Sequence, residues 1–213
     1  MVTSAPSASK PLRIGLTGGI GSGKSSVAQL LGSHGAAIVD TDAISRRLTA
    51  AGGLAIPALR EVFGEQVITA GGALDREYMR RLVFDDLSAR RRLEAILHPM
   101  ISSEAEREAA SHTAARVIVD DVPLLVEAGR WIDRVDRVLV VDCCEQTQIE
   151  RVVRRSGWPE NTVRSVIAAQ ATREQRRSVA DDLIVNDAIS PTELAERVAA
   201  LWRAWSTPQT GPL

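Results

Sequence analysis

Lysine is almost absent from this chain. Among its 213 residues only Lys10 and Lys24 are lysines, and every other basic side chain except the histidines is an arginine. An Asn-Lys-x-Asp motif, with which GTPases usually read the guanine base, is therefore excluded. We expect a disordered polar leader over residues 1–11 and a disordered tail over 206–213. Lys24 is then the one lysine of the expected folded body, and it lies inside a glycine-rich segment.

Cysteine is scarce as well, and the two cysteines are adjacent. Adjacent cysteines rarely form a disulfide with each other, and Cys143 and Cys144 do not have the spacing of a metal site. They end a hydrophobic run, so we expect buried free thiols and a cytoplasmic protein. No apolar segment approaches the length of a membrane span, and the leader lacks the apolar centre of a signal peptide.

The chain also lacks an excess of charge of either sign. A net charge of −1 gives no general attraction to nucleic acid or to an anionic membrane. We therefore expect neither as a partner, and we expect a monomer or a weak homo-oligomer. Any anion must be bound by local placement of charge.

Short apolar stretches alternate with helical patterns along most of the chain. The order strand, loop, helix, strand at its start predicts a parallel α/β sheet. Helical patterns alone fill about 42–112, which predicts a helical lobe inserted after the second strand. We expect a single domain over 12–205, with a helical lid at about 145–180. The strands are expected at 12–17, 36–40, 116–122, 137–143 and 182–187.

The segment TGGIGSGKSS, residues 17–26, contains the pattern G-x-x-x-x-G-K-[ST] of a P-loop. Glycines allow turns closed to other residues and the close approach of an anion. Successive N–H groups and the positive end of the next helix then hold phosphates. We expect Lys24 to reach the β and γ phosphates of a nucleoside triphosphate and Ser25 to bind Mg²⁺. The nucleotide contacts that we predict in the loop are Gly19, Ile20, Gly21, Ser22, Gly23, Lys24, Ser25 and Ser26.

A P-loop alone does not separate kinases from ATPases. The strand predicted at 116–122 contains Asp120 and Asp121, and an ATPase that acts on a protein partner also needs a strand ending in acids. The inserted helical lobe favours a small-molecule kinase, which must enclose its acceptor and exclude water. The ATPase remains the alternative.

Kinase chemistry often uses an acid that accepts the proton of the acceptor hydroxyl. Asp40 and Asp42 follow the second predicted strand, at the carboxyl edge where open parallel sheets bind ligands. Asp42 has an alternative use as the N-cap of the next helix. Beside a P-loop we favour the functional role for Asp42, with capping as well for one of the pair.

Arginines are the second requirement, since they spread the charge of a transferring phosphoryl group. We expect most of those in the late helical region to be solvated or paired with surface acids, and one or two to close onto ATP. The candidates are Arg151, Arg154, Arg155, Arg173, Arg176 and Arg177.

Seven stretches, taken in their order, resemble the dephospho-CoA kinase family, which carries out the last step of coenzyme A synthesis. They are LTGGIGSGKSSVAQLL, VDTDAISRRL, LHPMI, DVPLLVEAG, VLVVDC, QIERVVRR and AAQATREQRRSVADDLIVN. LHPMI and VPLLVE carry the most weight, because generic P-loop proteins lack them. The resemblance extends from about Leu12 to about Trp205. It implies that ATP, with Mg²⁺, phosphorylates the 3′-hydroxyl of the ribose in dephospho-CoA.

The resemblance also implies roles for individual residues. Asp42 would be the general base, Lys24 would hold ATP, and Arg151 would be a lid arginine that contacts phosphates during transfer. Asn186 would lie near the adenine of ATP, and Asp121 would join Ser25 near the metal. The acceptor would be bound by Asp42, Arg47, His98, Pro99 and Leu124. His98 and Pro99 have an alternative interpretation as a helix break, and the leucines of VPLLVE as plain core.

Overall fold

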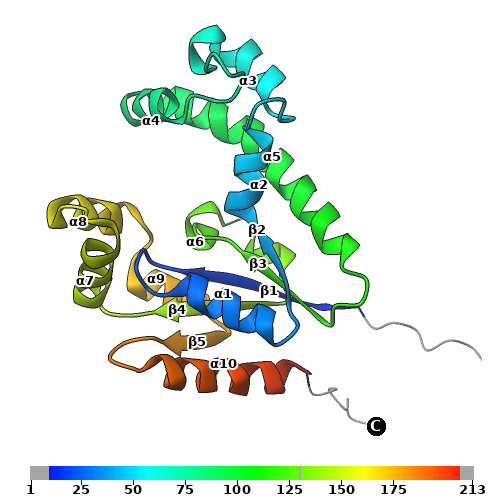
Figure 1. The fold of residues 1–213 in the computed structure, drawn as a ribbon, viewed down its shortest axis with the longest axis vertical. Coiled ribbons are helices and arrows are strands. Elements are labelled where there is room, and N and C mark those ends of the chain that lie inside the picture. The colour runs from blue at the N-terminus through cyan, green and yellow to red at the C-terminus, as the bar shows by residue number, and fades with distance from the viewer. Residues whose placement is uncertain (1–9, 130, 207–213) are drawn as a thin grey trace, which may run out of the picture. The chain divides into compact units, whose positions relative to one another are not determined.

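A five-stranded sheet with the strand order β2-β3-β1-β4-β5 organises the structure, a computed structural model that describes residues 10–129 and 131–206 (Figure 1). β1 pairs in parallel with β3 and β4, and β4 pairs in parallel with β5. The α/β class predicted from the sequence is therefore confirmed, and each strand begins and ends within two residues of its predicted position. The strands are β1 (Leu12–Gly18), β2 (Ala37–Asp40), β3 (Val117–Asp121), β4 (Arg137–Asp142) and β5 (Asp182–Val185).

Helices cover both faces of this sheet. α1 (Lys24–Ser33) and α10 (Pro191–Ser206) share one face, where their apolar side chains pack on alternate residues of the strands. α6 (Leu125–Ala128) and α9 (Arg173–Ser178) contact the sheet at β1 and β4. A Cβ added at Gly15 of β1 would lie only 2.6 Å from Cδ1 of Leu125, so α6 packs directly against the strand. The result is the three-layer arrangement expected of a P-loop fold.

Two further helices follow β4. α7 (Glu145–Ser156) and α8 (Glu160–Ala169) pack on one another through Ile149, Val152 and Val163, and Ile20 of the glycine loop packs against this cluster. A short 3₁₀ helix, η2 (Ile132–Arg134), precedes β4.

Ser190 is the N-cap of α10. The hydroxyl of Ser190 accepts a hydrogen bond from the N–H of Glu193 at 3.2 Å, and the carboxylate of Glu193 accepts one from the N–H of Ser190 at 2.7 Å. This reciprocal pair is a capping box, and Pro191 opens the helix directly after it.

The described residues divide into two compact units. Asp40–Ser111 form the helical unit, and the remaining residues form the sheet unit. Within the helical unit the only β pairing among described residues is an isolated bridge between Ile68 and Leu74, so the expectation of helices without a core strand is met. Its helices are α2 (Thr41–Leu48), α3 (Ile56–Phe63), η1 (Glu65–Val67), α4 (Arg76–Asp85) and α5 (Leu87–Ser111).

α5 corrects one alternative from the sequence. The helix runs through Pro99 without interruption, so His98 and Pro99 do not mark a helix break. None of the helices in the described ranges has the length and apolarity that crossing a bilayer requires.

Candidate active site

The glycine-rich segment forms a tight turn between β1 and α1. Gly21 and Gly23 have φ angles of 74° and 94°, in the left-handed region that favours glycine. A Cβ at Gly21 would lie 2.7 Å from the carbonyl oxygen of Gln148, and one at Gly23 would collide with the amide of Asn186. Gly23 is also the N-cap of α1 and gives the helix no side-chain cap. The positive end of α1 is therefore open to an anion.

Two side chains hold the carbonyl groups of this turn. The amide of Asn186, just after β5, donates to the carbonyl oxygen of Ser22 at 2.7 Å. The guanidinium of Arg151, from α7, donates to the carbonyl oxygens of Ser22 at 3.3 Å and Gly21 at 3.4 Å. The loop is thus supported from both β5 and α7.

The two acids at the end of β3 have different partners, because successive side chains of a strand point to opposite faces. Asp120 is fully buried and accepts two hydrogen bonds from the guanidinium of Arg13, at 2.5 and 3.1 Å. Asp121 points to the face of the sheet that α1 covers, and it forms an ion pair with the ammonium of Lys24. Only Asp121 is therefore placed beside the P-loop lysine.

A cavity of about 560 Å³ lies next to the loop in the sheet unit. Leu30, Ile189 and Leu194 give it apolar walls, and Arg151 and Asn186 give it polar ones. A mainly apolar cavity with a few polar groups is typical of a small-molecule site. Its complete lining is Gly23, Ser26, Gln29, Leu30, Ser33, Arg151, Asn186, Ile189, Ser190, Pro191 and Leu194.

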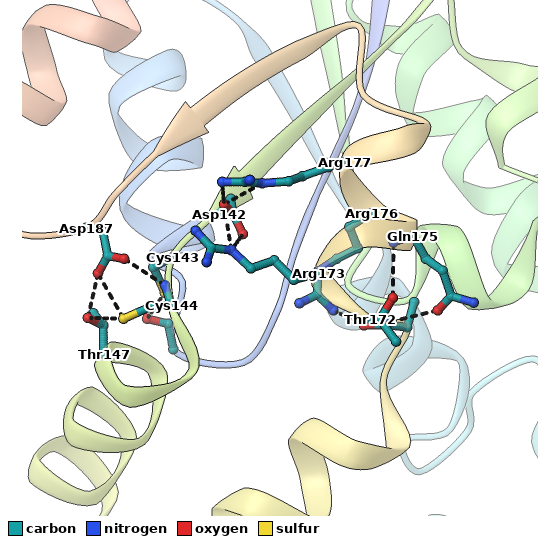
Figure 2. Close-up of polar contacts among 12 residues, drawn as sticks. Asp142, Cys143, Cys144, Thr147, Thr172, Arg173, Gln175, Arg176, Arg177 and Asp187 are labelled. Carbon is teal, nitrogen blue, oxygen red and sulfur yellow. Dashed lines mark hydrogen bonds and ion pairs between the residues drawn. The ribbon is translucent and has the colours of Figure 1, made fainter.

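Asp142 organises the arginines that follow α8. Its carboxylate is buried at the end of β4 and accepts hydrogen bonds from Nε of Arg173 at 2.8 and 2.9 Å and from Nε and a terminal nitrogen of Arg177 at 2.9 and 2.6 Å (Figure 2). The hydrogen bond to Asp142 raises the pKa of Arg173. Arg154 and Arg155, by contrast, are exposed on α7.

The adjacent cysteines are free thiols, as expected, but they differ in exposure. Cys143 is fully buried, and burial raises its pKa to about 11. Cys144 is only partly buried, which corrects the expectation of two buried thiols. Its N–H donates to Asp187 at 2.8 Å, and the hydroxyl of Thr147 donates to the same carboxylate at 2.5 Å. The hydrogen bond from Thr147 lowers the pKa of Asp187, and these contacts tie α7 to the end of β5.

The two acids at the start of the helical unit also separate in role. Asp40 is the N-cap of α2, because its carboxylate accepts the N–H of Ala43 at 2.8 Å. Asp42 lies in the first turn of the same helix and is exposed. Capping therefore belongs to Asp40, and the carboxylate of Asp42 is left for other chemistry.

The remaining predicted acceptor residues lie in both units. Arg47 forms an ion pair with Glu108 and lines a small cavity of about 150 Å³ in the helical unit. His98 is half-buried and Pro99 is exposed, both on α5. Leu124 belongs to the sheet unit, where it precedes α6 and is 49% exposed, unlike a core leucine.

The loop has three further neighbours whose contacts with it no sequence motif predicted, namely Gln148, Gln170 and Arg176. The side-chain oxygen of Gln170 accepts the N–H of Ile20 at 2.9 Å. Cβ atoms added at Gly19 would lie 2.6 Å from the amide nitrogen of Gln148 and 2.9 Å from a terminal nitrogen of Arg176. A contact between residues more than a hundred positions apart leaves no local pattern in the sequence. These contacts could therefore not be predicted from the sequence.

Ser25 and Asp121 are compatible with magnesium. The hydroxyl of Ser25 is exposed at the first turn of α1, and the carboxylate of Asp121 lies at Lys24. Both are oxygen donors, which Mg²⁺ prefers. In the described part of the chain there is no cluster of three or more acidic, histidine or cysteine side chains that could hold a metal. The site therefore fits an ion that takes few protein ligands and completes its shell with phosphate oxygens and water.

Comparison with known proteins agrees with this geometry. A family model described as dephospho-CoA kinase matches residues 12–191. A dephospho-CoA kinase of Burkholderia lata is 56% identical over 188 residues, which is 88% of this chain and 93% of that protein. A crystal structure from Thermus thermophilus is 34% identical, with a TM-score of 0.82 over 92% of this chain and 98% of that one.

A more distant structure supports the fold alone. The dephospho-CoA kinase from Campylobacter jejuni is 18% identical, with a TM-score of 0.61 over 91% of this chain and 97% of that chain. The family model extends from the first residue of β1 to the first residue of α10. This chain belongs to the dephospho-CoA kinase family, and its activity is the ATP-dependent phosphorylation of dephospho-CoA.

Proposed function

We propose that this kinase transfers the γ-phosphoryl group of ATP to the 3′-hydroxyl of the ribose in dephospho-CoA, giving coenzyme A and ADP. The observation that carries the proposal is the uncapped start of α1, with Lys24 on Asp121, beside a cavity of about 560 Å³. That arrangement suits a phosphate chain attached to a flat base.

The loop binds the phosphates and the cavity binds the nucleoside. Leu30, Ile189 and Leu194 contact the faces of the base, while the amide of Asn186 holds the loop and borders the same cavity. Lys24 exchanges Asp121 for the β and γ phosphates as ATP enters. Ser25 and Asp121 are the residues that would hold Mg²⁺ beside these phosphates. Mg²⁺, when bound, neutralises phosphate oxygens that would otherwise repel the attacking hydroxyl.

Asp42 acts as the general base. Its exposed carboxylate accepts the proton of the 3′-hydroxyl while that oxygen bonds to the γ phosphorus. The bond between the γ phosphorus and the bridging oxygen of ADP breaks in the same displacement, and ADP leaves with the electron pair. Arg151 supports the loop from α7 and stabilises the charge that spreads over the transferring group.

We assign acceptor binding to Arg47, His98, Pro99 and Leu124, together with Asp42. Arg47 offers a guanidinium at the small cavity of about 150 Å³, and Leu124 offers an exposed apolar side chain. The free thiols are compatible with a reducing compartment, and we place the enzyme in the cytoplasm.

A coupled assay of ADP release tests this function. We expect release that depends on dephospho-CoA, together with a product whose new phosphate is on the 3′-oxygen, as read by ³¹P NMR. ADP release at the same rate without dephospho-CoA would contradict the proposal and favour an ATPase that acts through a protein partner. A phosphate on another hydroxyl would keep the kinase and overturn the assigned position.

A further inference from the structure

We propose that Arg176 is a further catalytic residue, whose guanidinium binds the γ-phosphoryl group of ATP during transfer. The inference deepens the proposed function, since it rests on ATP phosphates occupying the glycine loop. Its basis is the position of a buried cation directly against that loop.

Arg176 lies on α9 and is only 5% exposed. A Cβ added at Gly19, the second glycine of the loop, would lie 2.9 Å from a terminal nitrogen of Arg176 and 3.3 Å from its central carbon. Any residue larger than glycine at this position would therefore displace the guanidinium. Among the six candidate arginines, Arg151 contacts the carbonyl groups of Gly21 and Ser22, whereas Arg176 is the one that faces Gly19.

The charge of Arg176 has no carboxylate partner among the described residues. Its guanidinium donates to the carbonyl oxygen of Ala171, and no acidic group of the described residues lies within ion-pair distance of it. Burial lowers the pKa of Arg176, although Glu127 and Asp142 at longer range oppose this effect. A guanidinium has five N–H donors, and one carbonyl leaves most of them for another acceptor. A buried cation without a counter-ion is costly, and an anion in the loop would remove that cost.

The neighbours of Arg176 show that this charge is not simply one member of a salt-bridge cluster. Arg173 and Arg177, on the same short helix, both point to Asp142 (Figure 2). Arg176 extends in a different direction, to the segment just before α9. One carboxylate thus receives two guanidinium groups, and the third arginine is directed to the loop.

The segment around Arg176 is held in place before any ligand binds. Thr172 and Gln175 form a capping box at the start of α9. The N–H of Ala171 donates to Glu127 at 2.7 Å, and Gln170 accepts the N–H of Ile20 at 2.9 Å. A cation held ready at the site of developing negative charge needs little reorganisation during the reaction, which is where electrostatic catalysis is most effective.

The test compares Arg176→Met and Arg176→Lys with Arg116→Met, a control at an exposed arginine just before β3. We measure kcat, the thermal midpoint, and the Kd values of ATP and ADP without acceptor. We expect Arg176→Met to lower kcat about 10²-fold, a typical loss for one preorganised donor. It should weaken ATP binding more than ADP binding, because only ATP carries the γ-phosphoryl group. Its thermal midpoint should stay equal or rise, since a buried unpaired charge is removed.

Two results would overturn the role of Arg176. The first is a lower thermal midpoint for Arg176→Met with kcat per folded molecule unchanged, which would make the residue structural. The second is equal weakening of ATP and ADP at a normal kcat. If the Met variant does not fold, Arg176→Lys provides the test, because it keeps the positive charge and loses the planar guanidinium. Partial retention of kcat and of the preference for ATP in this variant supports the role of Arg176. Retention of neither overturns it. Failure of the wild-type protein to phosphorylate dephospho-CoA would contradict the proposed function instead. The Kd values of ATP and ADP would still test the role of Arg176.

Discussion

The sheet unit and the helical unit differ in how deeply their ion pairs are buried. Beside exposed pairs such as Arg164–Glu160, the sheet unit contains two largely buried pairs between residues far apart in the chain, Arg13–Asp120 and Lys24–Asp121. The pairs of the helical unit, such as Arg81–Glu77 within one helix and Arg47–Glu108 between two, have an exposed arginine. Exposed pairs of this kind contribute little to stability. The buried ones orient specific groups.

The exposure of apolar side chains differs in degree. Leu54, Phe84 and Leu87 of the helical unit are 63%, 86% and 67% exposed, whereas the most exposed large apolar side chain in the described sheet unit is Leu124, at 49%. The described residues of the sheet unit bury a continuous core between the strands, α1 and α10. Long-range contacts within the sheet unit thus hold the glycine loop and the cavity beside it. We therefore expect substitutions in the sheet unit to alter the site for ATP, and substitutions in the helical unit to alter the acceptor step.

Lys24→Ala should have the largest effect on activity. It removes the cation that we expect at the β and γ phosphates and leaves Asp121 beside the loop without this partner. We expect kcat to fall on the order of 10³-fold, the upper end of the loss for one charge-stabilising donor. The coupled ADP assay measures it. Activity near that of the wild type would rule out the P-loop assignment.

Asp42→Asn should have the next largest effect and should act on transfer alone. We expect kcat to fall about 10²-fold or more, as for loss of a general base, with the Kd of ATP unchanged. Asp40→Asn is the matched control, because it alters the cap of α2 two residues away. That variant should keep kcat and change stability by about 1 kcal/mol or less. Equal loss of kcat in both variants would show that Asp42 acts through the fold.

The adjacent acids of β3 should separate stability from activity. Asp120→Asn leaves the guanidinium of Arg13 without its buried carboxylate, so we expect a loss of about 3 kcal/mol in the free energy of unfolding. Asp121→Asn should lower kcat with a smaller change in stability. Denaturant unfolding and the ADP assay, run on both variants, check this. An equal loss of unfolding free energy and an equal loss of kcat in the two variants would contradict the separate roles of Asp120 and Asp121.

Thiol labelling should give the smallest effect and report on the core of the sheet unit. The pKa of about 11 leaves Cys143 protonated at pH 8, and it is fully buried. Iodoacetamide should therefore label Cys144 first. Because only the thiolate reacts, the intrinsic reactivity of Cys143 should rise with pH until about 11. Mass spectrometry of the two cysteines checks the order. Cys143 reacting first would contradict its burial beneath the loop.

The sequence predicted the elements better than the contacts between them. Periodicity is local, so the five strands were predictable from the sequence. The choice between Asp40 and Asp42 as the helix cap was not, because either carboxylate follows the strand closely enough. It required the hydrogen bond from Ala43.

The arginines show the same limit more sharply. The sequence offered six candidates, of which one or two were expected to close onto ATP, and only the family resemblance singled out one of them, Arg151. Their ranking depends on Asp142, a residue separated by 31 positions from Arg173 and by 35 from Arg177. Burial of Arg176 likewise depends on the loop near the other end of the chain.

The link between Asp142 and α9 also sets an order of assembly. α9 has six residues, too few for a helix to persist by itself in water. Its two contacts with Asp142 exist only once β4 has joined the sheet, since only then is that carboxylate in place. We therefore expect the segment that carries Arg176 to become ordered only after β4 has paired in the sheet. On that expectation, a chain whose sheet has just formed would have its glycine loop before the guanidinium of Arg176 is in place beside it.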